Sequence, residues 1–166
     1  MLPLALALAI QIAPPSADTP YRQPQLAVSG EFVVVAFGSG NDIYVVSSRD
    51  AGRTFGTPVR IATGGKMALG RHRGPRVAIA GNTVVISAPV GEKGGGADGD
   101  LLAWRSADGG RGWAGPSRIN DRPAGAREGL HAMAGAPDGT VFAVWLDSRE
   151  GRNNLYGAKS ADGGAT

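Results

Sequence analysis

One short turn occurs three times in this chain and constrains its fold more than any other feature. The copies begin at Ser48, Ser106 and Ser160, which lie 58 and 54 residues apart. Each copy has the pattern Ser-x-Asp-x-Gly, and the first two close on an aromatic residue. A fixed period of this size is typical of repeat architectures, in which each repeat is one supersecondary unit. The sequence therefore predicts a fold assembled from repeated units.

The residue types of the turn explain its shape. An Asp side chain accepts hydrogen bonds from backbone N–H groups that follow it, and Gly tolerates positive φ angles. The closing aromatic residue is expected to pack beneath the turn. Structural roles of this kind are predicted for Ser48, Asp50, Gly52, Thr54, Phe55, Ser106, Asp108, Gly110, Trp113, Ser160, Asp162 and Gly164.

The composition favours an all-β fold. The chain contains 27 Gly and 11 Pro among 166 residues, yet 42% of the residues are hydrophobic, which fits short strands joined by tight turns better than disorder. No stretch beyond the N-terminus shows helical periodicity. Cysteine is absent, which excludes disulfides, thiolate zinc sites and a cysteine nucleophile.

The formal net charge of +3 is compatible with an anionic partner such as an acidic sugar. The arginines are scattered singly and form no basic run or stripe, so most are expected to be solvated surface residues. The sequence lacks the clustered aromatic and basic residues of nucleic-acid-binding proteins, and we expect no nucleic-acid partner. The oligomeric state is left open.

Residues 1–12 are almost wholly apolar. This run is too short to span a bilayer but suits the apolar region of a signal peptide, with cleavage after Ala17. We therefore expect 1–17 to be a signal peptide, the mature protein to be secreted or periplasmic, and no other membrane segment. The alternative is a buried strand or helix within the folded domain.

Strand-like runs recur in the same order around each turn. They predict three four-stranded antiparallel sheets, or blades, over residues 24–62, 76–120 and 130–166, the last without its outer strand. Such a sheet cannot bury both faces alone, and a ring of blades closes with four to eight of them. The expected domain, 18–166, is thus an incomplete β-propeller of about 2.7 blades, taken as a fragment of a longer ring.

In such sheets the three turns share one end, and the longer loops share the other. The turns are repeated once per blade, which argues against a single catalytic centre at their end. Binding and catalysis concentrate on loops that a rigid scaffold positions. We therefore expect any site at the loop end.

The repeated pattern Ser-x-Asp-x-Gly-x-Thr-Phe/Trp resembles the Asp box, or BNR repeat, of sialidases and related propellers. The resemblance runs from about Tyr21 onward and implies a six-bladed propeller and exo-α-sialidase activity. Tyr21-Arg22-Gln23-Pro24 is similar to the family's aromatic-Arg-Ile-Pro motif, which implies that Arg22 grips a substrate carboxylate. A guanidinium can meet a carboxylate in a bidentate pair.

Two further assignments follow from the same resemblance. Asp42 stands where sialidases place the general acid. Asp147-Ser148-Arg149 resembles a family pattern that follows a second strand, although here it lies in the third blade. This makes Asp147 and Arg149 candidates for substrate binding.

No metal or cofactor is expected. His72 and His131 lack a second histidine at ligand spacing, and the sequence contains neither Gly-x-Ser-x-Gly nor a phosphate-binding glycine loop. Two functions stay open. One is a sialidase-like glycoside hydrolase, truncated in this chain and inactive alone. The other is a non-catalytic Asp-box propeller that binds glycans or proteins.

Overall fold

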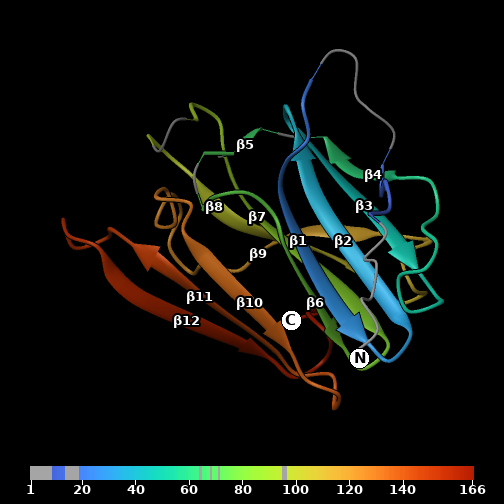
Figure 1. The fold of residues 1–166 in the computed structure, drawn as a ribbon. Coiled ribbons are helices and arrows are strands. Elements are labelled where there is room, and N and C mark those ends of the chain that lie inside the picture. Colours follow the sequence, from blue (N-terminus) through green and yellow to red (C-terminus); the bar gives the residue numbers. More distant parts are fainter. Residues whose placement is uncertain (1–8, 14–18, 64, 68, 71, 95–96) are drawn as a thin grey trace, which may run out of the picture.

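The fold consists of antiparallel sheets. A computed structural model describes residues 9–13, 19–63, 65–67, 69–70, 72–94 and 97–166, and within these ranges it contains strands and no helix. The strands form three sheets that lie side by side, as Figure 1 shows. The all-β fold class predicted from the sequence is confirmed.

The first sheet follows the chain without a crossover. It contains β1 (Arg22–Ser29), β2 (Phe32–Ser39), β3 (Asp42–Ser48) and β4 (Val59–Thr63), each paired antiparallel with the next. β2 is rich in β-branched residues and is buried over most of its length, as expected for a strand covered on both faces.

The second sheet contains β5 (Lys66–Met67), β6 (Arg76–Ala80), β7 (Thr83–Gly91), β8 (Asp100–Ser106) and β9 (Ala114–Arg118). β7 is long enough to pair with β6 over its first part and with the two-residue β5 at its end. The short β5 strand lies in a segment that the sequence pattern assigns to a crossing loop.

The outer strand of this sheet, β9, ends at Arg118, two residues before the predicted end of the second blade at 120. Asn120 is 1% exposed, and its side chain forms hydrogen bonds. Its Oδ1 accepts a hydrogen bond from the backbone N–H of Leu101 at 2.7 Å. A buried polar side chain needs such partners, so Asn120 serves as an anchor beyond the strand.

The third sheet contains β10 (His131–Gly135), β11 (Val141–Asp147) and β12 (Asn154–Ser160). One face of β11 is buried and the other is exposed in strict alternation over its first five residues. This period of two is the signature of a sheet with one covered face.

The core lies between neighbouring sheets. Val34, Ala36, Ile43 and Val45 of the first sheet pack against Val77, Val84, Ile86, Ala88 and Trp104 of the second. Smaller clusters join the second sheet to the third, including Leu101 against Trp145. Each fully buried aliphatic side chain contributes about 1.5–3 kcal/mol, so these interfaces hold the sheets together.

β1, β6 and β10 lie on the inside of the array. β6 lies against both β1 and β10, and the three run in the same direction in Figure 1. Gly135 of β10 comes so close to β6 that a Cβ atom there would overlap the carbonyl oxygen of Ile79.

The two outermost sheet faces carry exposed apolar side chains. On the third sheet these are Phe142, Val144 and Leu155, the last 72% exposed, and we call this the outward face. On the first sheet, Leu26 and Val28 are exposed. Most of the predicted signal peptide lies outside the described residues, but Ile12 and Ala13 pack against a cluster of the first sheet.

The three repeated turns have the same internal hydrogen bonds. In each, the Ser hydroxyl donates to the Asp carboxylate at 2.6–2.7 Å and accepts from a backbone N–H four residues on. The Asp carboxylate in turn accepts a backbone N–H four residues further along. The Ser48 hydroxyl is the main cause that holds the pKa of Asp50 far below its usual range. Each Asp carboxylate is therefore hydrogen-bonded within its own turn.

Removal of one such carboxylate should destabilise its sheet without altering a ligand site. We expect Asp108→Ala to lower the melting temperature by several degrees, because the N–H groups of Arg111 and Gly112 lose their acceptor. Circular dichroism on heating measures this. The control is Arg111→Ala in the same turn, and an unchanged melting temperature for Asp108→Ala would contradict the structural role.

Candidate functional site

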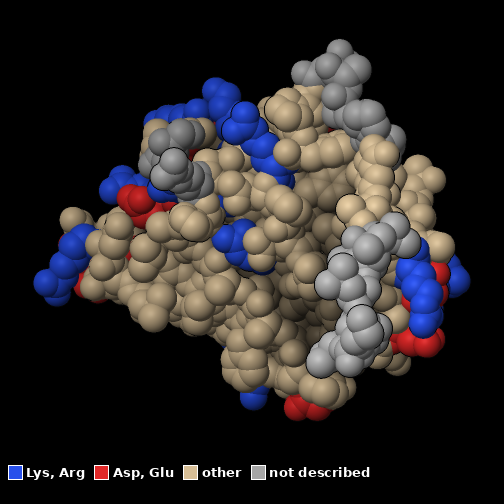
Figure 2. All heavy atoms as spheres, viewed as in Figure 1, with Lys and Arg blue, Asp and Glu red and all other residues tan. Residues whose placement is uncertain are grey.

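The strand directions separate two ends of the molecule. β1, β6 and β10 begin at one end, with Arg22, Arg76 and His131, and the repeated turns lie at the other. We call these the loop end and the turn end. β3 runs from Asp42 to Ser48, so at about 3.3 Å per residue the first repeated turn begins about 20 Å from Asp42. Figure 2 shows Lys and Arg side chains gathered over part of the loop end.

Arg22 is the first residue of β1 and pairs with Gly38 of β2. Its side chain is exposed and has no hydrogen-bond or ion-pair partner among the described residues. The next residue, Gln23, has a positive φ of 54° and donates from Nε2 to the carbonyl of Gly70 at 2.8 Å. The backbone beside Arg22 is thus fixed while its guanidinium is free.

Asp42 lies at the same end, at the start of β3, after the two-residue turn 40–41. Its carboxylate forms an ion pair with Arg60 at 3.7 Å. β2 separates Asp42 from Arg22, which places the two backbones about 10 Å apart. The general-acid role of Asp42 stays a prediction.

Asp147 and Arg149 contact each other. Asp147 is completely buried, and its Oδ2 accepts from Arg149 Nη2 at 2.7 Å and from Trp145 Nε1 at 3.1 Å. The Arg149 hydrogen bond is the main cause that lowers the pKa of Asp147 to about 2. Asp147 therefore acts through Arg149 and presents no open carboxylate to a ligand.

Arg149 is enclosed on several sides. It also forms a bidentate pair with Asp121, a residue of the crossing between the second and third sheets, and its guanidinium lies over the ring of Tyr156 at 4.0 Å. The hydrogen bonds to Asp147 and Asp121, in that order, hold the pKa of Arg149 above its usual value. Arg149 is a substrate-binding candidate whose charge is already balanced by two carboxylates.

Arg76 and His131 were not predicted as a pair, and they link the second and third sheets. Arg76 donates to four backbone carbonyls, including that of His131 at 3.1 Å. The His131 ring lies 3.0 Å from the buried hydroxyl of Ser87 through Nε2. Burial, followed by the charge of Arg76, lowers the pKa of His131 to about 4, so the ring is neutral at pH 7.

Among the described residues, no group of three or more His, Cys, Asp or Glu side chains could hold a metal ion. Within the same ranges, no helix has the length and apolar character to cross a membrane.

Three solved structures place the fold among known ones. An α-L-arabinanase from Penicillium chrysogenum matches 92% of this chain over 50% of its own length, with 14% identity and a TM-score of 0.57. The Hadza microbial sialidase Hz136 matches 88% over 36% of its length, with 19% identity and a TM-score of 0.60. A protein of unknown function from Dyadobacter fermentans DSM 18053 matches 92% over 54%, with 16% identity and a TM-score of 0.59.

The chain has the fold of a partial β-propeller. It spans about a third to a half of the length of these structures. No family model matches it, and no curated protein matches it. At these identities the likeness shows the fold alone.

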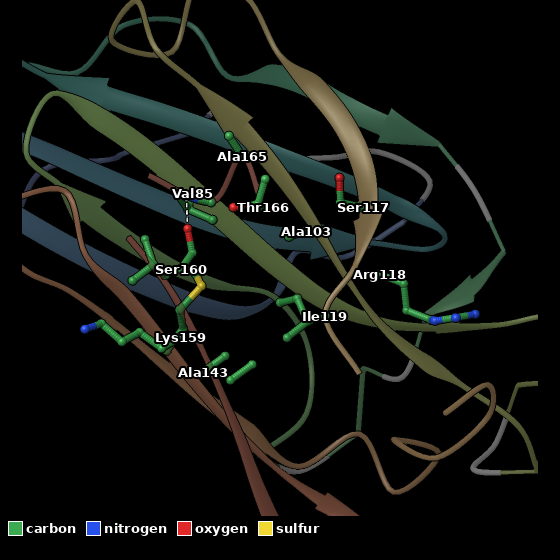
Figure 3. A pocket seen from close by; sticks show the side chains of 14 residues that line it. Val85, Ala103, Ser117, Arg118, Ile119, Ala143, Lys159, Ser160, Ala165 and Thr166 are labelled. Atoms are coloured by element: carbon green, nitrogen blue, oxygen red, sulfur yellow. Dashed lines mark hydrogen bonds between the residues drawn. The ribbon is translucent and has the colours of Figure 1, made fainter. Parts of the chain in front are cut away.

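In propeller terms, the sheets are blades. An apolar hollow lies between the second and third blades. It has a volume of about 230 Å³ and walls that include Val85, Ala103 and Ala143. In Figure 3 the charged groups of Arg118 and Lys159 point away from its centre. Sugar sites need polar groups that converge on the ligand, so we assign this hollow to blade packing.

Proposed function

We propose that the chain forms the glycan-binding blades of a propeller of the glycoside-hydrolase kind and that it binds an acidic sugar at its loop end. The observation that carries the proposal is the free guanidinium of Arg22 at the start of the innermost strand of the first blade. A charged donor without an internal partner, on a fixed backbone at the loop end, suits a ligand carboxylate.

The sialidase assignment is the finer part of this proposal. It rests on the Tyr21-Arg22-Gln23-Pro24 motif and on the Asp-box pattern of the three turns. The propeller fold and the placement of the turns opposite Arg22 support it. In this assignment Arg22 holds the carboxylate of the sugar, Asp42 is the candidate general acid, and the protein is secreted or periplasmic.

A non-catalytic glycan-binding propeller is the second candidate. The observation that favours it is the pairing of the loop-end acids, because Asp42 contacts Arg60, and Asp147 is buried against Arg149. A catalytic acid must reach the leaving-group oxygen, and neither carboxylate is free of a cation. Hydrolysis of 4-methylumbelliferyl sialoside by the complete propeller that contains these blades separates the two candidates.

Calorimetric titration with N-acetylneuraminic acid and with a neutral hexose tests binding. We expect only the acidic sugar to bind and expect Arg22→Ala to weaken it about tenfold, which corresponds to the loss of one charge-assisted contact. Arg22→Lys should also weaken binding, because an ammonium cannot reproduce the planar fork.

The control is Arg53→Ala at the turn end, which should leave the affinity unchanged. Equal affinity for both sugars, or the same loss with Arg53→Ala, would remove Arg22 as a carboxylate contact.

A further inference from the structure

A second basic site lies at the loop end, away from Arg22. The crossing between the second and third blades and the loop after β11 enclose a hollow of about 350 Å³. Its long side chains are Arg122, Arg127 and Arg149, and the remaining walls are formed by residues 123–125 and Ser148. We call it the arginine hollow.

Buried polar groups fix the loop that carries Arg122 and Arg127. Asp100 Oδ1 accepts from the backbone N–H of Ala124 and from Asn120 Nδ2, both at 2.7 Å. Asn120 Nδ2 also donates to the carbonyl of Arg122 at 2.6 Å. A network of this kind holds the loop in one conformation, which lowers the entropic cost of binding to it.

The contact between this loop and the loop after β11 is equally close. A Cβ atom on Gly125 would lie 2.6 Å from Asp147 Oδ2, so only glycine allows the loop to reach the Asp147–Arg149 pair. The backbone N–H of Ser148 donates to the carbonyl of Gly125 at 3.3 Å. The two loops therefore form one rigid rim.

Two of the arginines in this rim have no internal partner. Asp121 and Asp147 are paired with Arg149, and Glu128 is paired with Arg73 at 3.7 Å. Arg122 and Arg127 are exposed and have no side-chain hydrogen bond or ion pair among the described residues. Two of the arginines that line this open, preformed hollow thus have unpaired side chains.

The hollow is connected to Arg22 along the loop end. Arg73 donates from Nε to the carbonyl of Glu128 at 2.6 Å, next to Arg127. The neighbouring Gly74 lies against the side chain of Gln23, next to Arg22. A ligand that follows this row of contacts would meet positive charge at both ends.

We infer that the arginine hollow is a second anionic subsite and that the ligand is an acidic oligosaccharide with carboxylates on several residues, as in an oligouronate. The inference rests on the proposed function and names its substrate class. A single terminal acidic sugar would leave Arg122 and Arg127 unused. A nucleic acid fits less well, because no aromatic side chain lines the hollow for bases to stack on.

Calorimetry of the full chain with tetragalacturonic acid tests the inference, with N-acetylneuraminic acid as the single-charge probe. We expect the double variant Arg122→Ala/Arg127→Ala to weaken tetragalacturonic acid about 25-fold, or about fivefold for each exposed ion pair, and to leave the monosaccharide unchanged. The matched control is Arg53→Ala/Arg111→Ala, which removes the same charge at the turn end.

The outcomes separate this inference from the proposed function. If Arg22→Ala weakens binding of the monosaccharide but the double variant binds the tetrasaccharide with wild-type affinity, the subsite proposal is wrong and the proposed function stands. If the double variant weakens binding of the tetrasaccharide and Arg22→Ala changes neither affinity, the subsite proposal stands and the role proposed for Arg22 is wrong. An equal loss in the control, or equal binding of single-stranded DNA of the same charge, overturns the subsite.

Discussion

Replacement of Gly135 by alanine is expected to lower the free energy of unfolding by more than about 3 kcal/mol. The added Cβ atom would lie 2.6 Å from the carbonyl carbon of Ile79 and closer still to its oxygen. These are backbone atoms of β6, which is itself held between β1 and β10 and cannot retreat without moving the inner strands. Urea unfolding followed by circular dichroism measures the loss.

The matched control is Gly56→Ala, where the nearest atom to an added Cβ is the carbonyl oxygen of Ser47 at 3.8 Å. That distance is an ordinary contact, so the control should change stability by no more than about 0.5 kcal/mol. Similar stability for the two variants would show that β10 and β6 are not in close contact.

Stability should also fall as the pH drops from about 6.5 to about 4, because of His131. Its pKa is about 4 in the folded protein, against 6.5 for an unperturbed ring, so the unfolded chain binds the extra proton first in this range. The difference corresponds to about 3 kcal/mol, present above pH 6.5 and lost on reaching pH 4. Urea unfolding at a series of pH values measures the slope.

The control is His72→Asn, which removes the other, exposed histidine at a position with positive φ that Asn tolerates. It should keep the wild-type slope. The ring protons of His131 in NMR provide a direct reading that needs no variant. Titration of these protons near pH 6.5 would show that the ring is not buried as described.

The sequence predicted the strand order because each strand has a local signal. Alternation in 141–147 and the β-branched run of β2 define faces and burial, and the turn residues close each hairpin through bonds within a few residues. The exceptions are the two-residue β5, which lies in a segment assigned to a crossing loop, and the end of β9. The hydrogen bond from Leu101 to Asn120 joins residues 19 positions apart, and no local sequence pattern predicts it.

The candidate site was predicted only in part, for the same reason. Adjacent residues such as Asp147 and Arg149 could be grouped from the sequence, but the pairing of Arg149 with Asp121 depends on how two blades meet. Whether an arginine side chain has a partner within the protein likewise depends on tertiary contacts. It distinguishes Arg22, Arg122 and Arg127 from Arg76 and Arg149, which are the same residue type at the same end of the molecule.

The exposed side chains of the outward face affect how the folding of this protein should be followed. Phe142, Val144 and Leu155 offer an apolar surface that dyes such as ANS bind, although such fluorescence is normally taken as a sign of loosened packing. The native protein should therefore be bright in a dye-based thermal assay before any transition begins. Intrinsic fluorescence from Trp104 and Trp145, both buried between blades, reports instead on the interfaces that unfold.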